Sequence, residues 1–130
     1  MMPIAIVCAA VLGLLIFGLG LLVSMTRGNT NRVIGHDPDP ADRLHKRIRA
    51  HGNATEYVPM LAILILLVGA RQPSPWMQWT FVLATVSRYL HAAGMITCSS
   101  LAKPNPLRAV GAVGTYLTGF ALVVAALLRV

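Results

Sequence analysis

An uncharged apolar run extends from Ile4 to Met25 and limits this chain to folds that a lipid bilayer can hold. A helix needs about 20 apolar residues to cross the hydrocarbon core of a membrane, and this run is long enough. A cleaved signal peptide would carry basic residues before a shorter apolar stretch, whereas here the positive charges follow the run. The pattern therefore predicts a retained membrane-spanning helix.

Three more apolar segments follow, separated by short polar connections. We expect an all-α integral membrane four-helix bundle in which residues 1–130 form a single transmembrane domain. Its spans should cover about residues 4–25, 42–70, 76–97 and 107–128. Asp42 suits the N-terminus of the second helix. Pro59 lies inside that helix and cannot donate a backbone hydrogen bond, so we expect a kink there.

The net charge of +7 arises from basic residues that gather between the apolar segments. This distribution follows the positive-inside rule, and no basic stripe on a soluble domain indicates a nucleic-acid partner. The two connections that hold most of these residues are predicted to be cytoplasmic, which places both chain termini outside. Four basic residues are interpreted as determinants of this topology rather than as ligands: Arg43, Lys46, Arg47 and Lys103.

The two cysteines, Cys8 and Cys98, lie inside or at the edge of separate apolar segments. They have no metal-ligand spacing, and the chain has no Cys-x-x-Cys pair. We therefore expect two separate buried thiols, and we expect no metal site.

The only glutamate of the chain, Glu56, lies at the mouth of the second predicted span. Ionisable groups are costly within a membrane, so each one suggests a functional role and a nearby partner. Arg49, Asn53 and Glu56 follow one another at i, i+4 and i+7, which places them on one face of a helix. A cation, an amide and an anion in a row suit a small zwitterionic ligand.

Other polar residues are predicted to lie at the same cytoplasmic depth. Arg88 and His91 come near the end of the third span, and Arg108 opens the fourth. In a purely structural alternative, Arg49 pairs with Glu56 and His91 is a hydrogen-bonded core residue. However, one glutamate cannot neutralise three arginines, and the surplus positive charge favours an anionic ligand.

Three motifs follow one another along the chain: Arg49-x-x-x-Asn53-x-x-Glu56-Tyr57-x-Pro59, Arg88-x-x-His91-x-x-Gly94 and Pro106-Leu107-Arg108. Together they closely resemble the signature of the MAPEG family, the membrane-associated proteins of eicosanoid and glutathione metabolism. The resemblance covers nearly the whole chain and is closest to the short bacterial members. It implies an integral protein of a bacterial inner membrane.

The resemblance implies a homotrimer that holds glutathione between neighbouring subunits at the cytoplasmic end. It also implies a transferase or peroxidase activity on lipophilic electrophiles that arrive through the lipid. Arg108 matches the family arginine that holds the glutathione sulfur as a thiolate. A thiol with a pKa of about 8.5 becomes a better nucleophile at neutral pH beside such a cation. By the same resemblance, glutathione would be bound by Arg49, Asn53, Glu56, Tyr57, Arg88 and His91.

The chain departs from two specialised members of this family. His91 and Met95 stand where the leukotriene C synthase type has tyrosines, and Ala109 stands where the prostaglandin E synthase type has a serine. Neither eicosanoid activity is therefore expected. Tyr116, about two turns into the fourth helix, could reach a pocket but is interpreted as a packing residue. The alternative is a non-catalytic membrane protein of the same fold that binds a lipid or a partner. A small transporter is less favoured, because the chain has no internal repeat.

Overall fold

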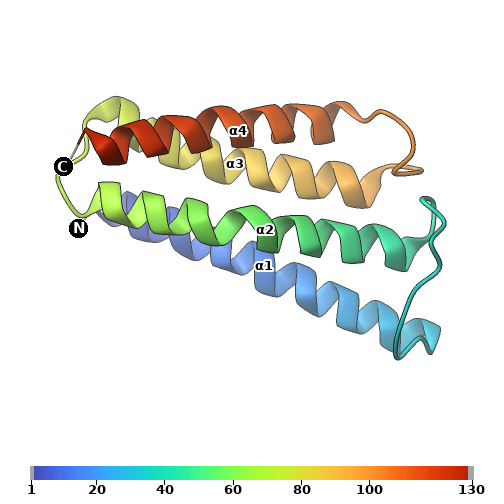
Figure 1. The fold of residues 1–130 in the computed structure, drawn as a ribbon. Helices are drawn as coiled ribbons and strands as arrows, with labels where there is room; N and C mark the ends of the chain where they lie inside the picture. Colours follow the sequence, from blue (N-terminus) through green and yellow to red (C-terminus); the bar gives the residue numbers. More distant parts are fainter. Residues whose placement is uncertain (1, 129–130) are drawn as a thin grey trace.

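The computed structural model describes residues 2–128, which form four α-helices and no strand. The helices are α1 (Pro3–Thr30), α2 (Arg43–Gly69), α3 (Pro75–Thr97) and α4 (Pro106–Leu127). They lie side by side along a common axis, as Figure 1 shows, with the chain alternating in direction from one helix to the next. This arrangement confirms the predicted all-α bundle. Helix α1 continues beyond its predicted end at residue 25. It ends at Thr30 and is capped by Asn31, whose backbone is left-handed, with φ of 53°, and whose N–H donates to the Arg27 and Gly28 carbonyls.

Local signals at the helix N-termini agree with these boundaries. Helices α1, α3 and α4 each begin with a proline in the first turn, where its missing N–H costs nothing. Asp42 caps α2, as predicted, by accepting a hydrogen bond from the His45 N–H at 2.8 Å. Asn105 caps α4 by accepting one from the Arg108 N–H at 3.0 Å. The cap therefore places Arg108 in the first turn of α4. Helix α2 continues through Pro59 without interruption.

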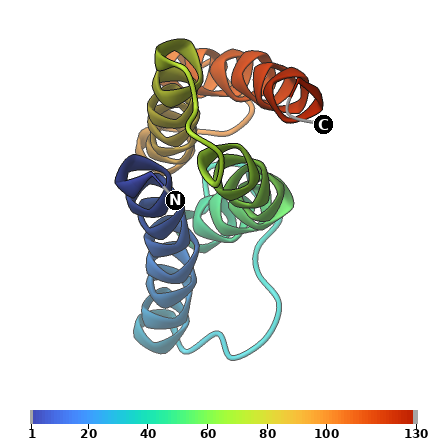
Figure 2. The same cartoon turned by 90° about the vertical axis from the view of Figure 1, so that its left-hand side faces the viewer.

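Helix α3 contacts each of the other three helices, and α1 and α4 lie on opposite sides of the described chain without touching (Figure 2). The apolar core between the helices includes Leu12, Ile65, Phe81 and Leu122, all of which are fully buried. Burial of such side chains stabilises the packing of the helices against one another. Cys8 and Cys98 are both buried and unpaired, as predicted.

Helices α1, α2 and α4 are long and apolar enough to cross a membrane by length and composition. Helix α3 falls short of that criterion because it carries polar residues, among them Ser87, Arg88 and His91. All three are buried inside the bundle rather than exposed at its surface. Polar side chains on an intramembrane helix are tolerated when they face neighbouring helices. The span over residues 76–97 stays a prediction.

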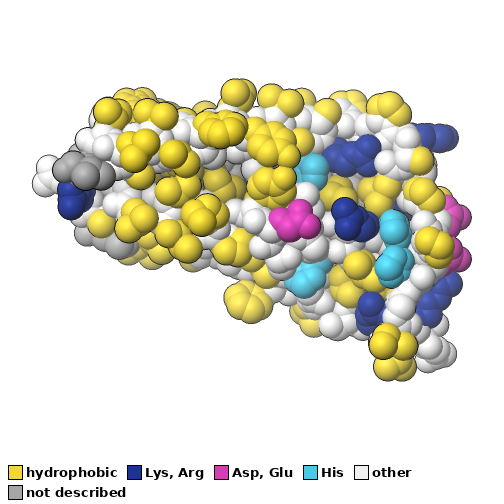
Figure 3. All heavy atoms as spheres, in the orientation of Figure 1, with side chains coloured by type: hydrophobic (Ala, Val, Ile, Leu, Met, Phe, Trp, Pro, Cys, Tyr) yellow, Lys and Arg dark blue, Asp and Glu magenta, His cyan; other side chains and the backbone are white. Residues whose placement is uncertain are grey.

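The two ends of the bundle differ in polarity. The termini and the α2–α3 connection lie at one end, and the α1–α2 and α3–α4 loops lie at the other (Figure 1). On the face drawn in Figure 3, charged and histidine side chains gather over the half that is nearer to these two loops, whereas hydrophobic side chains dominate the other half.

Hydrogen bonds tie the loop end together. The Leu101 N–H donates to the Pro40 carbonyl at 2.9 Å, and this bond joins the two loops. The Lys46 ammonium donates to the Cys98 carbonyl at 2.8 Å, and the Arg47 guanidinium donates to the Thr26 hydroxyl. Both basic side chains thus bind other parts of the same chain.

At two glycines, the backbones of helices α3 and α4 are in direct contact. A Cβ atom on Gly111 would lie 2.4 Å from the backbone nitrogen of His91. A Cβ atom on Gly94 would lie 2.4 Å from the backbone nitrogen of Arg108. Small residues permit such close crossing of membrane helices. The crossing brings the start of α4 against the polar end of α3.

We expect Gly111→Ala to destabilise the bundle by about 1–3 kcal/mol, because its methyl group would meet the α3 backbone, which cannot move aside as a side chain can. Gly119→Ala is the matched control on the same helix, since its Cβ would meet only Leu61 Cδ2 at 3.8 Å, an ordinary contact. Both changes gain the same helix propensity. Thermal unfolding in detergent measures the difference, and equal midpoints would contradict the close crossing.

Candidate functional site

Arg88 is the centre of a polar cluster inside the bundle. Its side chain is 1% exposed, and its guanidinium donates hydrogen bonds to Asn53 Oδ1 at 2.6 Å and to the Thr115 hydroxyl at 3.3 Å. The guanidinium carbon also lies 5.2 Å from the centre of the Tyr57 ring, within the range of a cation–π interaction. One arginine of α3 therefore binds residues of α2 and α4.

One hydrogen-bond donor of Arg88 has no acceptor within the described part of the chain. Among the described residues, nothing accepts a hydrogen bond from its Nε–H, although this atom is buried. Leaving a buried charged donor without a partner is costly, so such an atom marks a place for a ligand or water. A cavity of about 30 Å³ lies beside Arg88, Asn53 and His91.

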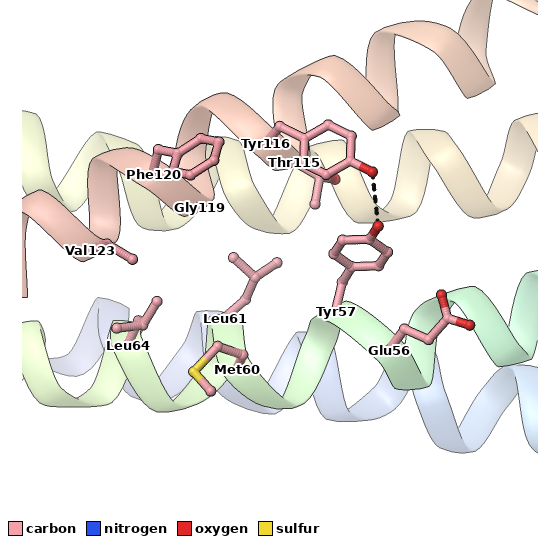
Figure 4. A pocket seen from close by; sticks show the side chains of 10 residues that line it. All are labelled: Glu56, Tyr57, Met60, Leu61, Leu64, Thr115, Tyr116, Gly119, Phe120 and Val123. Carbon is pink, nitrogen blue, oxygen red and sulfur yellow. Dashed lines mark hydrogen bonds between the residues drawn. The ribbon is translucent and has the colours of Figure 1, made fainter.

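Tyr57 and Tyr116 connect α2 to α4 at the edge of this cluster. Their hydroxyl oxygens are 2.8 Å apart, and their rings meet edge to face with centres 5.8 Å apart. Figure 4 shows the two hydroxyl groups pointing toward one another from the two helices. Tyr116 is thus more than the packing residue that the sequence suggested, because it forms the hydrogen bond that closes the polar cluster toward α4.

The close crossing of α3 and α4 brings His91 to Arg108. The His91 Nδ1 atom lies 2.9 Å from the backbone carbonyl of Arg108, so this nitrogen is hydrogen-bonded to the first turn of α4. The Arg108 guanidinium points along a different direction and donates to the carbonyls of Leu101 at 2.9 Å and Lys103 at 3.1 Å in the α3–α4 loop. These two bonds use only part of its five N–H donors.

Arg49 and Glu56 are both exposed on α2, and within the described part of the chain they form no ion pair. The Arg49–Glu56 pair of the structural alternative is therefore not formed. Asn53, which lies between them in the motif, is half-buried and accepts a hydrogen bond from Arg88. The predicted face of α2 is thus divided, with the amide directed inward and the two charges at the surface.

Three neighbouring cavities run along α4. The cavity beside Arg108 has a volume of about 420 Å³ and shares His91 and Ala112 with the small cavity beside Arg88. That small cavity shares Tyr57 and Tyr116 with a third cavity of about 330 Å³ between α2 and α4. Glu56 lies at the polar end of the third cavity, as Figure 4 shows.

The structure therefore brings together four of the seven predicted site residues around one small cavity: Asn53, Tyr57, Arg88 and His91. Glu56 and Arg108 line the cavities that adjoin it on either side. Arg49 remains apart from this cluster on the exposed surface of α2. Sequence reasoning missed Thr115 and interpreted Tyr116 as packing, although both lie about two turns further along α4 than Arg108.

The family model for MAPEG proteins matches residues 5–128, which is nearly the whole chain. The chain belongs to the MAPEG family. A search of curated proteins finds no match to it.

MAPEG proteins are helical bundles of the membrane, and this chain is accordingly an integral membrane protein. The family includes glutathione transferases and peroxidases, and it also includes members without catalytic activity. The family generally uses glutathione.

Proposed function

We propose that this MAPEG protein is a glutathione-dependent transferase or peroxidase that acts on lipophilic electrophiles. It works as a homotrimer in a bacterial inner membrane, with both termini outside and the site at the cytoplasmic end. Arg108 stabilises the glutathione thiolate, and six further residues bind the tripeptide: Arg49, Asn53, Glu56, Tyr57, Arg88 and His91.

The observation that carries this proposal is the state of Glu56. It is an exposed carboxylate within a helix that can span a membrane, and it has no ion pair among the described residues. Such a charge is costly unless something covers and compensates it. The free ammonium group of glutathione supplies the opposite charge, and a charge-assisted hydrogen bond between the two groups is strong.

Three arginines at the same end of the bundle suit the other charges of the ligand. Arg88 keeps a buried N–H donor unused, and Arg108 keeps donors beyond those that hold the α3–α4 loop. Arg49 is exposed on the surface of α2. Arginine binds carboxylates in a bidentate manner, and glutathione carries two carboxylates.

Within the reaction, the residues of this chain divide into two groups. Asn53 holds Arg88 by a hydrogen bond of 2.6 Å and so keeps a rigid cation beneath the ligand. The Arg108 guanidinium, restrained by the Leu101 and Lys103 carbonyls, provides a fixed positive charge that favours the ionised form of a thiol. A homotrimer covers the exposed charges of α2 with a neighbouring subunit, which agrees with their cost in lipid.

We expect Glu56→Gln to weaken glutathione binding by about 10- to 100-fold, because it removes a charge-assisted hydrogen bond worth about 1.5–3 kcal/mol. Isothermal titration calorimetry on the detergent-purified protein measures the change. Asp37→Asn is the matched control, since it removes a carboxylate from the exposed α1–α2 loop. The native mass of the assembly should be the same in both variants.

Two results would count against the proposal. Unchanged affinity in Glu56→Gln would remove the ammonium partner. Absence of glutathione binding by the unmodified protein would instead favour the non-catalytic alternative, in which the same cluster serves a lipid or a partner.

A further inference from the structure

The ammonium group of Lys46 joins the start of α2 to the end of α3, at the right of Figure 1. It donates a hydrogen bond of 2.8 Å to the carbonyl of Cys98, the residue that follows α3. The last carbonyl groups of a helix carry partial negative charge, so a cation beside them is favourable. Within the described range of α3, Pro75–Thr97, the last turn holds no basic residue. Lys46 therefore supplies from α2 the positive charge that the end of α3 lacks.

The α3–α4 loop that begins at Cys98 also holds the side chain of Arg108. Leu101 lies in this loop and forms two hydrogen bonds with its backbone. Its N–H donates to the Pro40 carbonyl at 2.9 Å, and its carbonyl accepts from the Arg108 guanidinium at 2.9 Å. The Lys103 carbonyl accepts a second bond from the same guanidinium, at 3.1 Å. The orientation of the Arg108 side chain thus depends on the course of this loop.

The loop is attached at its start, its middle and its end. Lys46 binds the carbonyl at the start, and the Pro40 carbonyl binds Leu101 in the middle. At the end, the Asn105 side chain caps α4. The bond from Lys46 is the one with a charged donor, and such bonds are roughly twice as strong as neutral ones. It is also made by a side chain of another helix, so a single substitution on α2 can remove it.

Movement of this loop would change the cavity beside Arg108. Three loop residues line that cavity of about 420 Å³ together with Arg108: Pro104, Asn105 and Pro106. A displaced loop would therefore alter the cavity wall and the direction of the guanidinium at the same time. Stabilisation of an anion depends on donors that are fixed before the anion forms. A misplacement of about 1 Å, even one caused from a distance, can lower a rate about 100-fold.

We propose that Lys46 is a positioning residue for Arg108. Its bond to the end of α3 fixes the α3–α4 loop, and the loop carbonyls hold the Arg108 guanidinium in the orientation that stabilises the glutathione thiolate. This inference rests on the proposed function, which gives Arg108 that role. Lys46 itself does not touch glutathione in this assignment. The role adds to the topological one that the positive-inside rule gives to Lys46.

Amide hydrogen exchange tests the attachment of the loop without glutathione. Lys46→Met keeps an unbranched apolar side chain and removes the charged donor. In the full-length protein in detergent, we expect the backbone amides of residues 98–105 to exchange about 10-fold faster in this variant, because the loop opens more often. Lys46→Arg keeps a charged donor and should restore slow exchange. Equal exchange in Lys46→Met and the unmodified protein would overturn the proposal.

Turnover and the thiolate band of bound glutathione test the orientation of Arg108. With 1-chloro-2,4-dinitrobenzene, Lys46→Met should lower kcat about 10-fold and change glutathione affinity less than about 2-fold. The midpoint of the thiolate band should move higher by about 0.5–1 pH unit, and Lys46→Arg should restore both values. Arg43→Met is the matched control, since it removes an exposed positive charge one turn earlier on α2. Equal effects in Arg43→Met and Lys46→Met would refute positioning, because loss of charge alone would explain them.

A double-mutant cycle shows whether Lys46 acts through Arg108. If it does, Lys46→Met should cause no further loss of kcat when Arg108 is already replaced by alanine. Additive losses would show that Lys46 acts independently, which would overturn the assignment. A thiolate band that is present in the unmodified protein and unchanged in Lys46→Met would overturn this inference alone. A protein that neither binds glutathione nor shows the band would instead overturn the proposed function, and the assignment with it.

Discussion

Arg108→Ala is expected to lower kcat for glutathione conjugation by about 100- to 1,000-fold, while glutathione affinity falls much less. The reason is that a thiol with a pKa of about 8.5 is only a few per cent ionised at neutral pH unless a cation lies beside it. The thiolate absorption band of bound glutathione in the ultraviolet measures the ionised fraction directly. We expect the band at neutral pH in the unmodified protein and its loss in the variant.

The pH dependence of the band gives a second readout. A fixed cation lowers the pKa of the thiol, so its removal shifts ionisation to higher pH. In Arg108→Ala the thiolate band should therefore be absent at neutral pH and should return when the pH is raised above about 9. A structural collapse of the site would not be reversed in this way.

Arg108 also holds the α3–α4 loop through the carbonyls of Leu101 and Lys103, and this role must be separated from its charge. Arg108→Lys keeps the positive charge but cannot reproduce both hydrogen bonds. It should retain a substantial thiolate band. If binding and thiolate formation were lost equally in Arg108→Ala, the special role of this residue in ionisation would be refuted.

Arg88→Ala is expected to reduce stability by about 3–5 kcal/mol, the largest structural effect of any substitution in the polar cluster. The change removes a fully buried side chain together with its hydrogen bonds to Asn53 and Thr115, and it leaves a cavity. It also leaves Asn53 Oδ1 without its donor, which adds a desolvation cost. Unfolding in denaturant, followed by circular dichroism in detergent, measures the loss.

A paired design separates the structural role of Arg88 from its role in binding. Arg88→Met keeps most of the volume but leaves the Asn53 amide unsatisfied, whereas the double variant with Asn53→Leu removes both polar partners. Replacing both partners of a buried hydrogen bond is often far less destabilising than removing one. We expect the double variant to regain stability relative to Arg88→Met and still fail to bind glutathione. Restored binding would show that Arg88 serves the fold alone.

Much of the fold was predictable because membrane insertion leaves few alternatives. A run of apolar residues that must satisfy every backbone group internally becomes a helix, and the connections between such runs are polar. The predicted N-cap at Asp42 was confirmed for the same local reason, since a side-chain oxygen there satisfies a free backbone N–H. Helix α3 was also predicted as a span, but its most apolar stretch is less apolar than those of the other three helices because it carries polar residues that are buried within the bundle.

The candidate site was predictable only as a set of residues at one depth. Spacing along α2 placed Arg49, Asn53 and Glu56 on one face, but a face covers a wide angle and does not say which partner each side chain meets. In the structure Asn53 turns inward to Arg88, and the two charges stay at the surface. Partner choice depends on the neighbouring helices, and these come from distant parts of the chain.

The sequence by itself determined the four helices, their polar end and the residue types that gather there, since these follow from local propensity and from the cost of charge in lipid. Only the tertiary structure decided three further features. It packed α3 against α4 at Gly111, it directed the Arg108 guanidinium to loop carbonyls, and it paired Tyr57 with Tyr116. Each depends on how closely two helices approach and rotate, which side-chain packing across the whole bundle sets.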